Sequence, residues 1–276
     1  MKIGIIGLGL IGGSLAMSIR RHTDHTVFGF DIDPEVVLRA RAMEAIHDEL
    51  DDAALKTCDI VLVALYPELC VQVIREHAAD FNPHALVIDC AGVKRHVCRQ
   101  VEPLAAQYDW TFIGGHPMAG REFSGFANAR GNLFENASMI LCPGPEVSIE
   151  AREAAKAFFL ESGFRMVRFC TPEAHDQMIA YTSQLAHVVS GAYVKNPLSA
   201  SHKGFSAGSF LDMTRVARLN EDMWTELFLE NDDLLLPALD DLILRLNQYR
   251  DALAARNPAD LRAALREGRL RKEALD

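Results

Sequence analysis

The sequence predicts an α/β protein in which an N-terminal, Rossmann-type, doubly wound and mostly parallel sheet is followed by an all-helical C-terminal domain. Two patterns predict this architecture: strand-length apolar runs alternate with helical patterns as far as residue 170, and only helical patterns follow. A third observation, a glycine-rich turn between the first strand and the first helix, predicts a nucleotide site at the sheet.

The first residues are expected to fold as strand, helix, strand and helix. These elements are Ile3–Ile6, 12–21, Thr26–Phe30 and Pro34–Met43. Five further strands are expected at Ile60–Leu65, Ala85–Cys90, Thr111–Gly114, Met139–Cys142 and Met166–Cys170. Helical patterns at Leu69–Phe81, Val93–Gln107 and Ile149–Ser162 lie between them. This alternation is typical of a parallel sheet with helices on both faces.

The domain boundary is expected after Cys170, which divides residues 1–170 from residues 171–276. Pro172 and Glu173 are favoured in the first turn of a helix, and a helix from there to about Asn196 would connect the domains. Farther on, apolar residues recur at helical spacing: Met223, Trp224, Leu227, Phe228, Leu234, Leu235, Leu239, Leu242, Ile243 and Leu246. Such a set indicates a helical core or a subunit interface, so a homodimer is expected.

Composition narrows the possible functions. The 276 residues are 49 % hydrophobic and carry a net charge of −10, which disfavours a nucleic-acid partner. Six scattered cysteines without a C-x-x-C pair indicate reduced thiols in a cytoplasm rather than disulfides or a metal site. The uncharged stretch Ile3–Ile19 contains five glycines, so we interpret it as a strand and helix start and expect no membrane segment.

Gly7, Gly9 and Gly12 form G-x-G-x-x-G directly after the first strand. In that context the first glycine permits a tight turn, the second lets a pyrophosphate approach the backbone, and the third lets helix and strand pack closely. The helix start at Leu10 and Ile11 would then offer its free N–H groups to the phosphates.

Asp31 ends the second strand, where a carboxylate can accept hydrogen bonds from the adenine ribose and repel a 2′-phosphate. No arginine follows it, so the expected cofactor is NAD rather than NADP. A purely structural reading, in which the glycines only form a turn and Asp31 only caps it, remains an alternative.

One loop carries a more specific signal. The residues Gly114-Gly115-His116-Pro117-Met118-Ala119-Gly120-Arg121-Glu122-Phe123-Ser124-Gly125 precede Leu133-Phe134-Glu135-Asn136, and this order resembles the prephenate dehydrogenase family. Three further segments agree: Asp89–Lys94, Ser183–Val189, and Asp212–Ala217 leading to Met223 and Trp224. The resemblance therefore spans nearly the whole chain.

The resemblance implies NAD-dependent oxidative decarboxylation of prephenate, a dianionic cyclohexadienol, to 4-hydroxyphenylpyruvate in tyrosine biosynthesis. It implies that His116 is the base for the ring hydroxyl, with His187 as a second active-site histidine. It implies that Arg215 binds a substrate carboxylate and that Ser124 and Glu122 lie around the pocket. The residues alone also allow a loop histidine at His116, a core histidine at His187, an Arg215–Asp212 pair and a surface charge at Glu122.

The sequence departs from the family pattern at two positions. Many relatives carry a serine where this chain has Gly92, so another group must supply that contact with the substrate hydroxyl and the histidine. Arg121 stands where relatives often have threonine, which affects the expected substrate choice or feedback by tyrosine.

Three other functions remain open at this stage. Arogenate dehydrogenase is the nearest. A β-hydroxyacid dehydrogenase would use a lysine on the interdomain helix, but Lys195 is late in that helix and the His-Pro loop would be unexplained. A nucleotide-sensing Rossmann module without catalysis is the alternative from another class.

Overall fold

The computed structural model describes residues 1–121 and 123–275. Its N-terminal part is a single eight-stranded sheet with the order β3-β2-β1-β4-β5-β6-β7-β8. The strands are β1 (Lys2–Ile6), β2 (Thr26–Phe30), β3 (Asp48–Glu49), β4 (Ile60–Val63), β5 (Leu86–Asp89), β6 (Thr111–Pro117), β7 (Ser138–Pro143) and β8 (Met166–Phe169). Helices alone follow β8, so the predicted fold class is confirmed.

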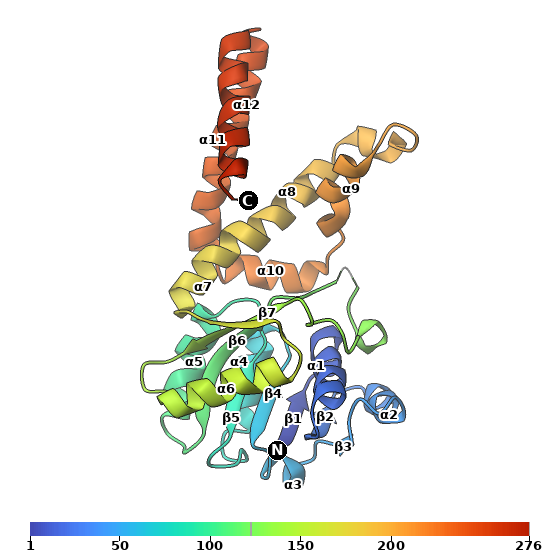
Figure 1. The fold of residues 1–276 in the computed structure, drawn as a ribbon, viewed down its shortest axis with the longest axis vertical. Helices are drawn as coiled ribbons and strands as arrows, with labels where there is room; N and C mark the ends of the chain where they lie inside the picture. Colours follow the sequence, from blue (N-terminus) through green and yellow to red (C-terminus); the bar gives the residue numbers. More distant parts are fainter. Residues whose placement is uncertain (122, 276) are drawn as a thin grey trace.

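All neighbouring strands are parallel except β6 and β7, which pair antiparallel. The N-terminus lies at the end of the sheet that is far from the helical part of the chain (Figure 1). The carboxyl ends of the parallel strands therefore face the helices, and in open α/β sheets this is the edge at which ligands bind.

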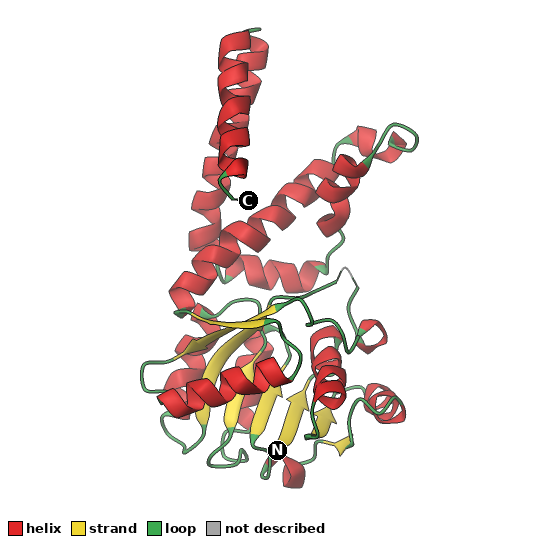
Figure 2. Cartoon of the chain, in the orientation of Figure 1, coloured by secondary structure: helices red, strands yellow, loops and turns green. Residues whose placement is uncertain are grey.

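Helices cover both faces of the sheet (Figure 2). One apolar core packs under α1 (Leu10–His22), α2 (Pro34–Ala42) and α6 (Ile149–Glu161). A second core lies under α3 (Asp52–Leu55), α4 (Pro67–Glu76) and α5 (Arg95–Ala105). Strands β1, β4 and β5 are buried almost throughout, as expected for a sheet covered on both faces.

The helical part begins at Thr171, whose hydroxyl caps α7 by accepting from the N–H of Ala174 at 3.2 Å. Its helices are α7 (Pro172–Ile179), α8 (Leu185–Val194), α9 (Gly208–Thr214), α10 (Glu221–Leu229), α11 (Asp232–Ala254) and α12 (Pro258–Glu273). A π-helical segment, Ala180–Gln184, joins α7 to α8. The predicted connecting helix is therefore present, with one irregular turn in its middle.

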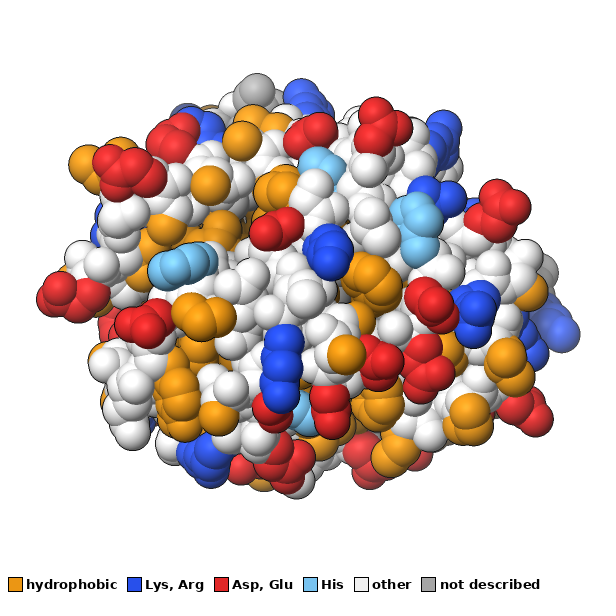
Figure 3. Space-filling model, turned by 90° about the horizontal axis from the view of Figure 1, so that it is seen from below, with side chains coloured by type: hydrophobic (Ala, Val, Ile, Leu, Met, Phe, Trp, Pro, Cys, Tyr) orange, Lys and Arg blue, Asp and Glu red, His pale blue; other side chains and the backbone are white. Residues whose placement is uncertain are grey.

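The helical part forms two arms above the sheet, one of α8 and α9 and one of α11 and α12 (Figure 1). Seen from the opposite end of the molecule, acidic and basic side chains are interspersed with apolar ones (Figure 3). The carboxyl edge of the sheet lies below the arms, where α10 crosses it (Figure 1).

Candidate active site

The glycine turn has the geometry that a dinucleotide site needs. Gly7 adopts φ +87°, and its N–H donates to the carbonyl of Phe30 at 2.8 Å. A Cβ on Gly12 would lie 1.8 Å from the Gly7 carbonyl oxygen, so only glycine fits there. A Cβ on Gly9 would meet nothing within 4 Å, and no side chain caps α1. Space and unpaired N–H groups at Leu10 and Ile11 therefore fit a pyrophosphate.

Asp31 ties the end of β2 to this turn. One carboxylate oxygen accepts the N–H of Leu8 at 2.9 Å, and the other accepts the N–H of Asp33 at 3.0 Å. The structural reading of Asp31 as a cap thus describes part of its role. Each carboxylate oxygen has a second lone pair, so the half-buried side chain can still accept from a ribose hydroxyl.

His116 lies within β6, two residues beyond the predicted strand end, and not on the loop after it. The strand continues because Gly115 allows close packing against β5 and Gly114 allows close packing against Cys98 of α5. A Cβ on Gly115 would lie 2.5 Å from the Asp89 carbonyl oxygen. The carboxyl ends of β6 and β1 share one edge, three strand spacings or about 14 Å apart. His116 and the glycine turn therefore lie at the same edge of the sheet.

A buried ion pair supports this region of β6. Lys94 Nζ donates to Asp89 Oδ2, and both side chains are fully buried. Asp89 also accepts the N–H of Ala91 at 2.9 Å and that of Gly115 at 3.1 Å. Burial alone would lower the pKa of Lys94, but the charge of Asp89 raises it above its ordinary value. Lys94 is therefore protonated, and the Asp89 carboxyl beside it holds Gly115 next to β5.

The ring of His116 belongs to a chain of three polar groups. Its Nδ1 lies 2.8 Å from His175 Nε2, and His175 Nδ1 lies 2.7 Å from Asp176 Oδ1. Burial, together with the charges of His175 and Lys94, lowers the pKa of His116. Burial also lowers the pKa of His175, although Asp176 opposes that shift. A neutral imidazole at His116 can accept a proton, as a general base must.

His175 and Asp176 were not expected at the site. From the sequence, the start of α7 was expected only as a helix beginning at Pro172 and Glu173. The only signal was two adjacent residues, a histidine and an aspartate, one turn into the helix that leaves the sheet.

His187 belongs to a second group, on the helices. Its ring stacks on Trp224 of α10 with centroids 3.7 Å apart, and its Nδ1 donates to the Ser183 carbonyl at 2.9 Å. Burial lowers the pKa of His187, and the charge of Arg215 lowers it further, so the guanidinium lies near the ring. Among the described contacts, His187 and Arg215 thus share one group and His116 belongs to another.

The loop after β6 reaches toward the second group. Arg218 lies over the Phe123 ring, 4.4 Å from its centroid. Ser124 is exposed beside Phe123, and its carbonyl accepts from Asn128 at 2.8 Å. Glu122 lies outside the described residues. The loop that carries Ser124 therefore lies against the segment that follows Arg215.

The structure shows the surroundings of Gly92, which stands in place of the family serine, and of Lys195, the lysine of the rival hydroxyacid dehydrogenase reading. A Cβ on Gly92 would lie 3.0 Å from Leu227 Cδ2, so a leucine from α10 packs where a serine side chain would begin. Lys195 is exposed just beyond α8. That position gives no support to a lysine-dependent hydroxyacid dehydrogenase.

Among the described residues, one group has the spacing of metal ligands: Glu68, His96 and Glu230. His96 Nε2 lies 3.0 Å from Glu68 and 3.6 Å from Glu230, so contacts among these three side chains account for the arrangement. Burial and the charges of Glu226 and Glu68 raise the pKa of Glu230 to about 8. This group joins α4, α5 and the end of α10, and Glu230 lies near Asp176 of the histidine chain.

Comparison with known proteins identifies relatives of both parts of the chain. The nucleotide-binding domain model of prephenate dehydrogenase matches residues 15–168, and the dimerization domain model matches residues 171–267. The prephenate dehydrogenase of Bacillus subtilis is 33 % identical over 256 residues, which are 89 % of this chain and 68 % of that protein.

Two solved structures cover the whole chain. The prephenate dehydrogenase of A. aeolicus in complex with hydroxyphenyl propionate and NAD+ has a TM-score of 0.88 and 26 % identity, with 100 % of this chain and 98 % of that chain covered. The arogenate dehydrogenase of Synechocystis has a TM-score of 0.82 and 27 % identity, with both chains fully covered at 100 %. Two matched domain models and relatives along its full length place the chain in the prephenate dehydrogenase family.

Proposed function

We propose that this protein catalyses the NAD-dependent oxidative decarboxylation of prephenate to 4-hydroxyphenylpyruvate, a step in tyrosine biosynthesis. The observation that carries the proposal is the neutral imidazole of His116 on the same sheet edge as an open glycine turn. Such a pair can hold a hydroxylated ring between a base and a nicotinamide. The A. aeolicus relative, which binds NAD+ and hydroxyphenyl propionate, supports both ligands.

The cofactor would be held by the backbone of Gly7, Gly9 and Gly12, the start of α1, and the carboxylate of Asp31. When bound, NAD supplies a hydride acceptor for the carbon that bears the ring hydroxyl. The carboxylate of Asp31 would repel a 2′-phosphate, which favours NAD over NADP.

His116 takes the proton of the ring hydroxyl as that carbon is oxidised. Carbon dioxide then leaves, and its bonding electrons complete an aromatic ring. Because aromatisation drives this step, the protein needs only to orient the substrate and to provide one base.

The substrate's two carboxylates need cations in a chain with a net charge of −10. We assign Arg215 to one of them, because a guanidinium can form two parallel hydrogen bonds with a carboxylate. His187 lies beside Arg215, and the family pattern assigns Ser124 and Glu122 to the substrate pocket. These assignments follow the family pattern at each position.

Arogenate is the second candidate substrate, because a relative named arogenate dehydrogenase is 27 % identical over the full chain. The test is NADH or NADPH formation by the purified protein with prephenate and with arogenate, each supplied with NAD and NADP. We expect the highest kcat/KM with prephenate and NAD. A higher kcat/KM with arogenate would make arogenate the substrate instead of prephenate. The absence of turnover with either compound would refute the proposal.

We further propose that residues 1–170 form the NAD-binding domain and residues 171–276 the substrate and dimerisation domain. The sheet ends with β8 at Phe169, and the two family models meet between residues 168 and 171, which supports this division.

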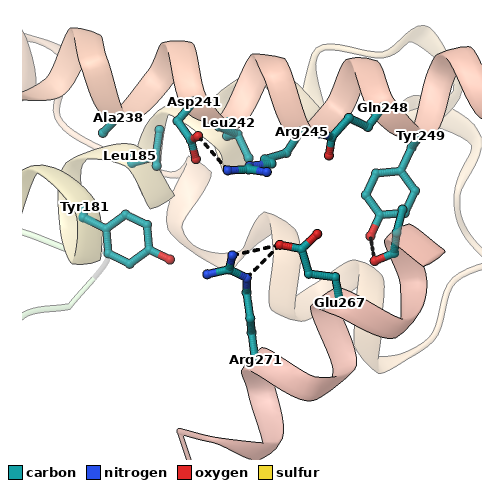
Figure 4. A pocket seen from close by; sticks show the side chains of 12 residues that line it. Tyr181, Leu185, Ala238, Asp241, Leu242, Arg245, Gln248, Tyr249, Glu267 and Arg271 are labelled. Atoms are coloured by element: carbon teal, nitrogen blue, oxygen red, sulfur yellow. Dashed lines mark hydrogen bonds and ion pairs between the residues drawn. The ribbon is translucent and has the colours of Figure 1, made fainter. Parts of the chain in front are cut away.

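A homodimer through the C-terminal helices fits the surface of α11 and α12. Many large apolar side chains are exposed there: Leu236, Ile243, Leu244, Leu246, Leu253, Leu265 and Leu270. A cavity of about 300 Å³ opens between the two helices, lined by the ion pairs Arg245–Asp241 and Arg271–Glu267 and by Tyr181 (Figure 4). We expect light scattering to give twice the mass of one chain.

We assign the protein to the cytoplasm. All six cysteines are free rather than paired in disulfides, which supports a reducing compartment. Burial raises the pKa of the Cys58 thiol to about 12. Within residues 1–121 and 123–275, no helix has the length and apolar character needed to cross a membrane.

A further inference from the structure

His175 and Asp176 have no part in the chemistry described so far, although they contact the base directly. Both side chains are fully buried, and they belong to α7 rather than to the sheet. A buried histidine and aspartate in line with a base are placed to control its protonation. The inference below rests on the proposed role of His116.

The direction of each hydrogen bond follows from Asp176. Burial would raise the pKa of this carboxyl, but hydrogen bonds from His175 and from the N–H groups of Arg95 and Lys94 hold it below its ordinary value. The N–H of Lys94 donates to Oδ1 at 2.7 Å, and Arg95 donates to Oδ2 from its N–H at 2.9 Å and from Nε at 3.2 Å. Asp176 is therefore an ionised acceptor.

An ionised acceptor at Asp176 requires the Nδ1 of His175 to carry a hydrogen. The Nε2 of a neutral His175 is then an acceptor, because only one ring nitrogen is protonated. His116 must consequently donate its Nδ1 hydrogen to His175. Its own Nε2 is left with a free lone pair, which is the nitrogen a general base uses.

We propose that His175, held by Asp176, is a positioning residue that fixes His116 in the tautomer with a free Nε2 and stabilises the imidazolium formed during turnover. The proton leaves the substrate hydroxyl for Nε2 and returns to the same oxygen when the aromatic ring forms. The electron pair of the broken C–H bond leaves as the hydride described above, so no further oxidant or proton acceptor is needed.

Charged groups of both signs surround His116 and His175. Lys94 lies near both histidines and disfavours their cations, while Asp89 and Asp176 favour the cation of His175. Arg95 is ion-paired with Asp176 and Asp233. Asp176 is the carboxylate in contact with His175, so its charge stabilises an imidazolium that shares its proton along the chain.

The tautomer can be measured without substrate. In protein labelled with ¹⁵N-histidine, NMR at neutral pH distinguishes a ring protonated at Nδ1 from one protonated at Nε2. We expect His116 to carry its hydrogen on Nδ1, and hydrogen on Nε2 would overturn the proposal. This measurement does not depend on activity. A wrong assignment of the His116 tautomer can therefore be distinguished from a wrong assignment of the reaction.

Kinetics provide the second arm. His175→Leu should lower kcat by about 10²–10³-fold, with the KM for prephenate and the Kd for NAD changed by no more than about threefold. The acid limb of the pH profile should move to lower pH, because a neutral His175 accepts a hydrogen bond from protonated His116 and leucine removes that acceptor. His175→Gln offers an amide oxygen to His116 Nδ1 and should recover at least about tenfold of the lost kcat.

A merely structural role predicts a different pattern. Equal kcat losses in His175→Leu and His175→Gln with an unmoved acid limb would contradict the proposal, as would a folded His175→Leu variant with unchanged kcat. If His175→Leu does not fold, the His175→Gln variant and the NMR measurement still decide the question.

Discussion

Replacing Lys94 with methionine tests the buried ion pair that supports the His116 strand. Methionine fills a similar volume but leaves the Asp89 carboxylate without its counter-charge. Both side chains of the pair are fully buried, so water cannot solvate the remaining charge. Lys94→Met should therefore destabilise the protein far more than the loss of a surface lysine.

The structure sets the expected magnitude. Removal of one partner from a buried pair costs about 3–5 kcal/mol. Asp89 keeps the N–H donors of Ala91 and Gly115, which places this case near the lower end, about 3 kcal/mol. For a domain of this size that loss corresponds to a melting temperature lower by about 6–12 °C. The deficit should shrink as pH falls, because an unpaired buried carboxyl has a raised pKa and becomes protonated.

The assay is urea unfolding of the whole chain, followed by circular dichroism at several pH values. Lys56→Met is the matched control, since the Lys56–Asp80 pair at 3.4 Å is exposed and should be worth less than about 1 kcal/mol. Asp89→Asn combined with Lys94→Met should recover part of the loss. Equal effects of Lys94→Met and Lys56→Met, at every pH, would refute the reasoning.

The remaining predictions concern the cofactor, the substrate and pH. Gly9→Ala should change the free energy of unfolding by less than about 0.5 kcal/mol but weaken NAD binding at least about tenfold. Gly12→Ala should weaken NAD binding and also lower the free energy of unfolding by about 2 kcal/mol or more. Denaturation and NAD titration measure the two effects, and equal stability losses in both variants would be inconsistent with the open space at Gly9. Arg215→Ala should raise the KM for prephenate by about 10-fold or more in steady-state assays, with Arg215→Lys intermediate; an unchanged KM would locate the carboxylate elsewhere. The pKa of Glu230 is raised from 4.5 to about 8, so the folded state holds a proton that the unfolded chain loses and stability falls as pH rises through that window. Glu230→Gln should therefore melt a few degrees higher than the original protein near pH 8 and no higher near pH 4, and a gain of equal size at both would exclude this titration.

Most of the sheet could be predicted from local patterns. The strand Thr26–Phe30 was predicted with its observed bounds, because a short apolar run between turn residues leaves little choice. The strand Asp48–Glu49 was missed, since two exposed acidic residues carry no apolar pattern. The antiparallel direction of β7 was also not predicted, because periodicity carries no information on strand direction.

The part of the active site that lies within the His116 motif could be predicted from the sequence, and the residues that contact it from elsewhere in the chain could not. The strand was predicted to end at Gly114, because glycine usually interrupts a strand. Gly115 instead permits close contact with β5, and the strand continues through His116. His175 is 59 residues from His116 in the chain, and no local pattern predicts that pairing. The π-helical segment Ala180–Gln184 was not predicted for the same reason. Its Gln184 side chain donates to the Leu227 carbonyl at 2.7 Å, and that residue is distant in the sequence.

The most direct test is the turnover of prephenate by His116→Asn, measured as NADH formation beside an NAD titration of the same sample. Asparagine can keep a hydrogen bond toward His175 but offers no basic nitrogen to the substrate. We expect kcat to fall about 10²–10⁴-fold while the Kd for NAD stays within about threefold. A variant that binds NAD and turns over prephenate as fast as the original protein would contradict the assignment of His116 as the base.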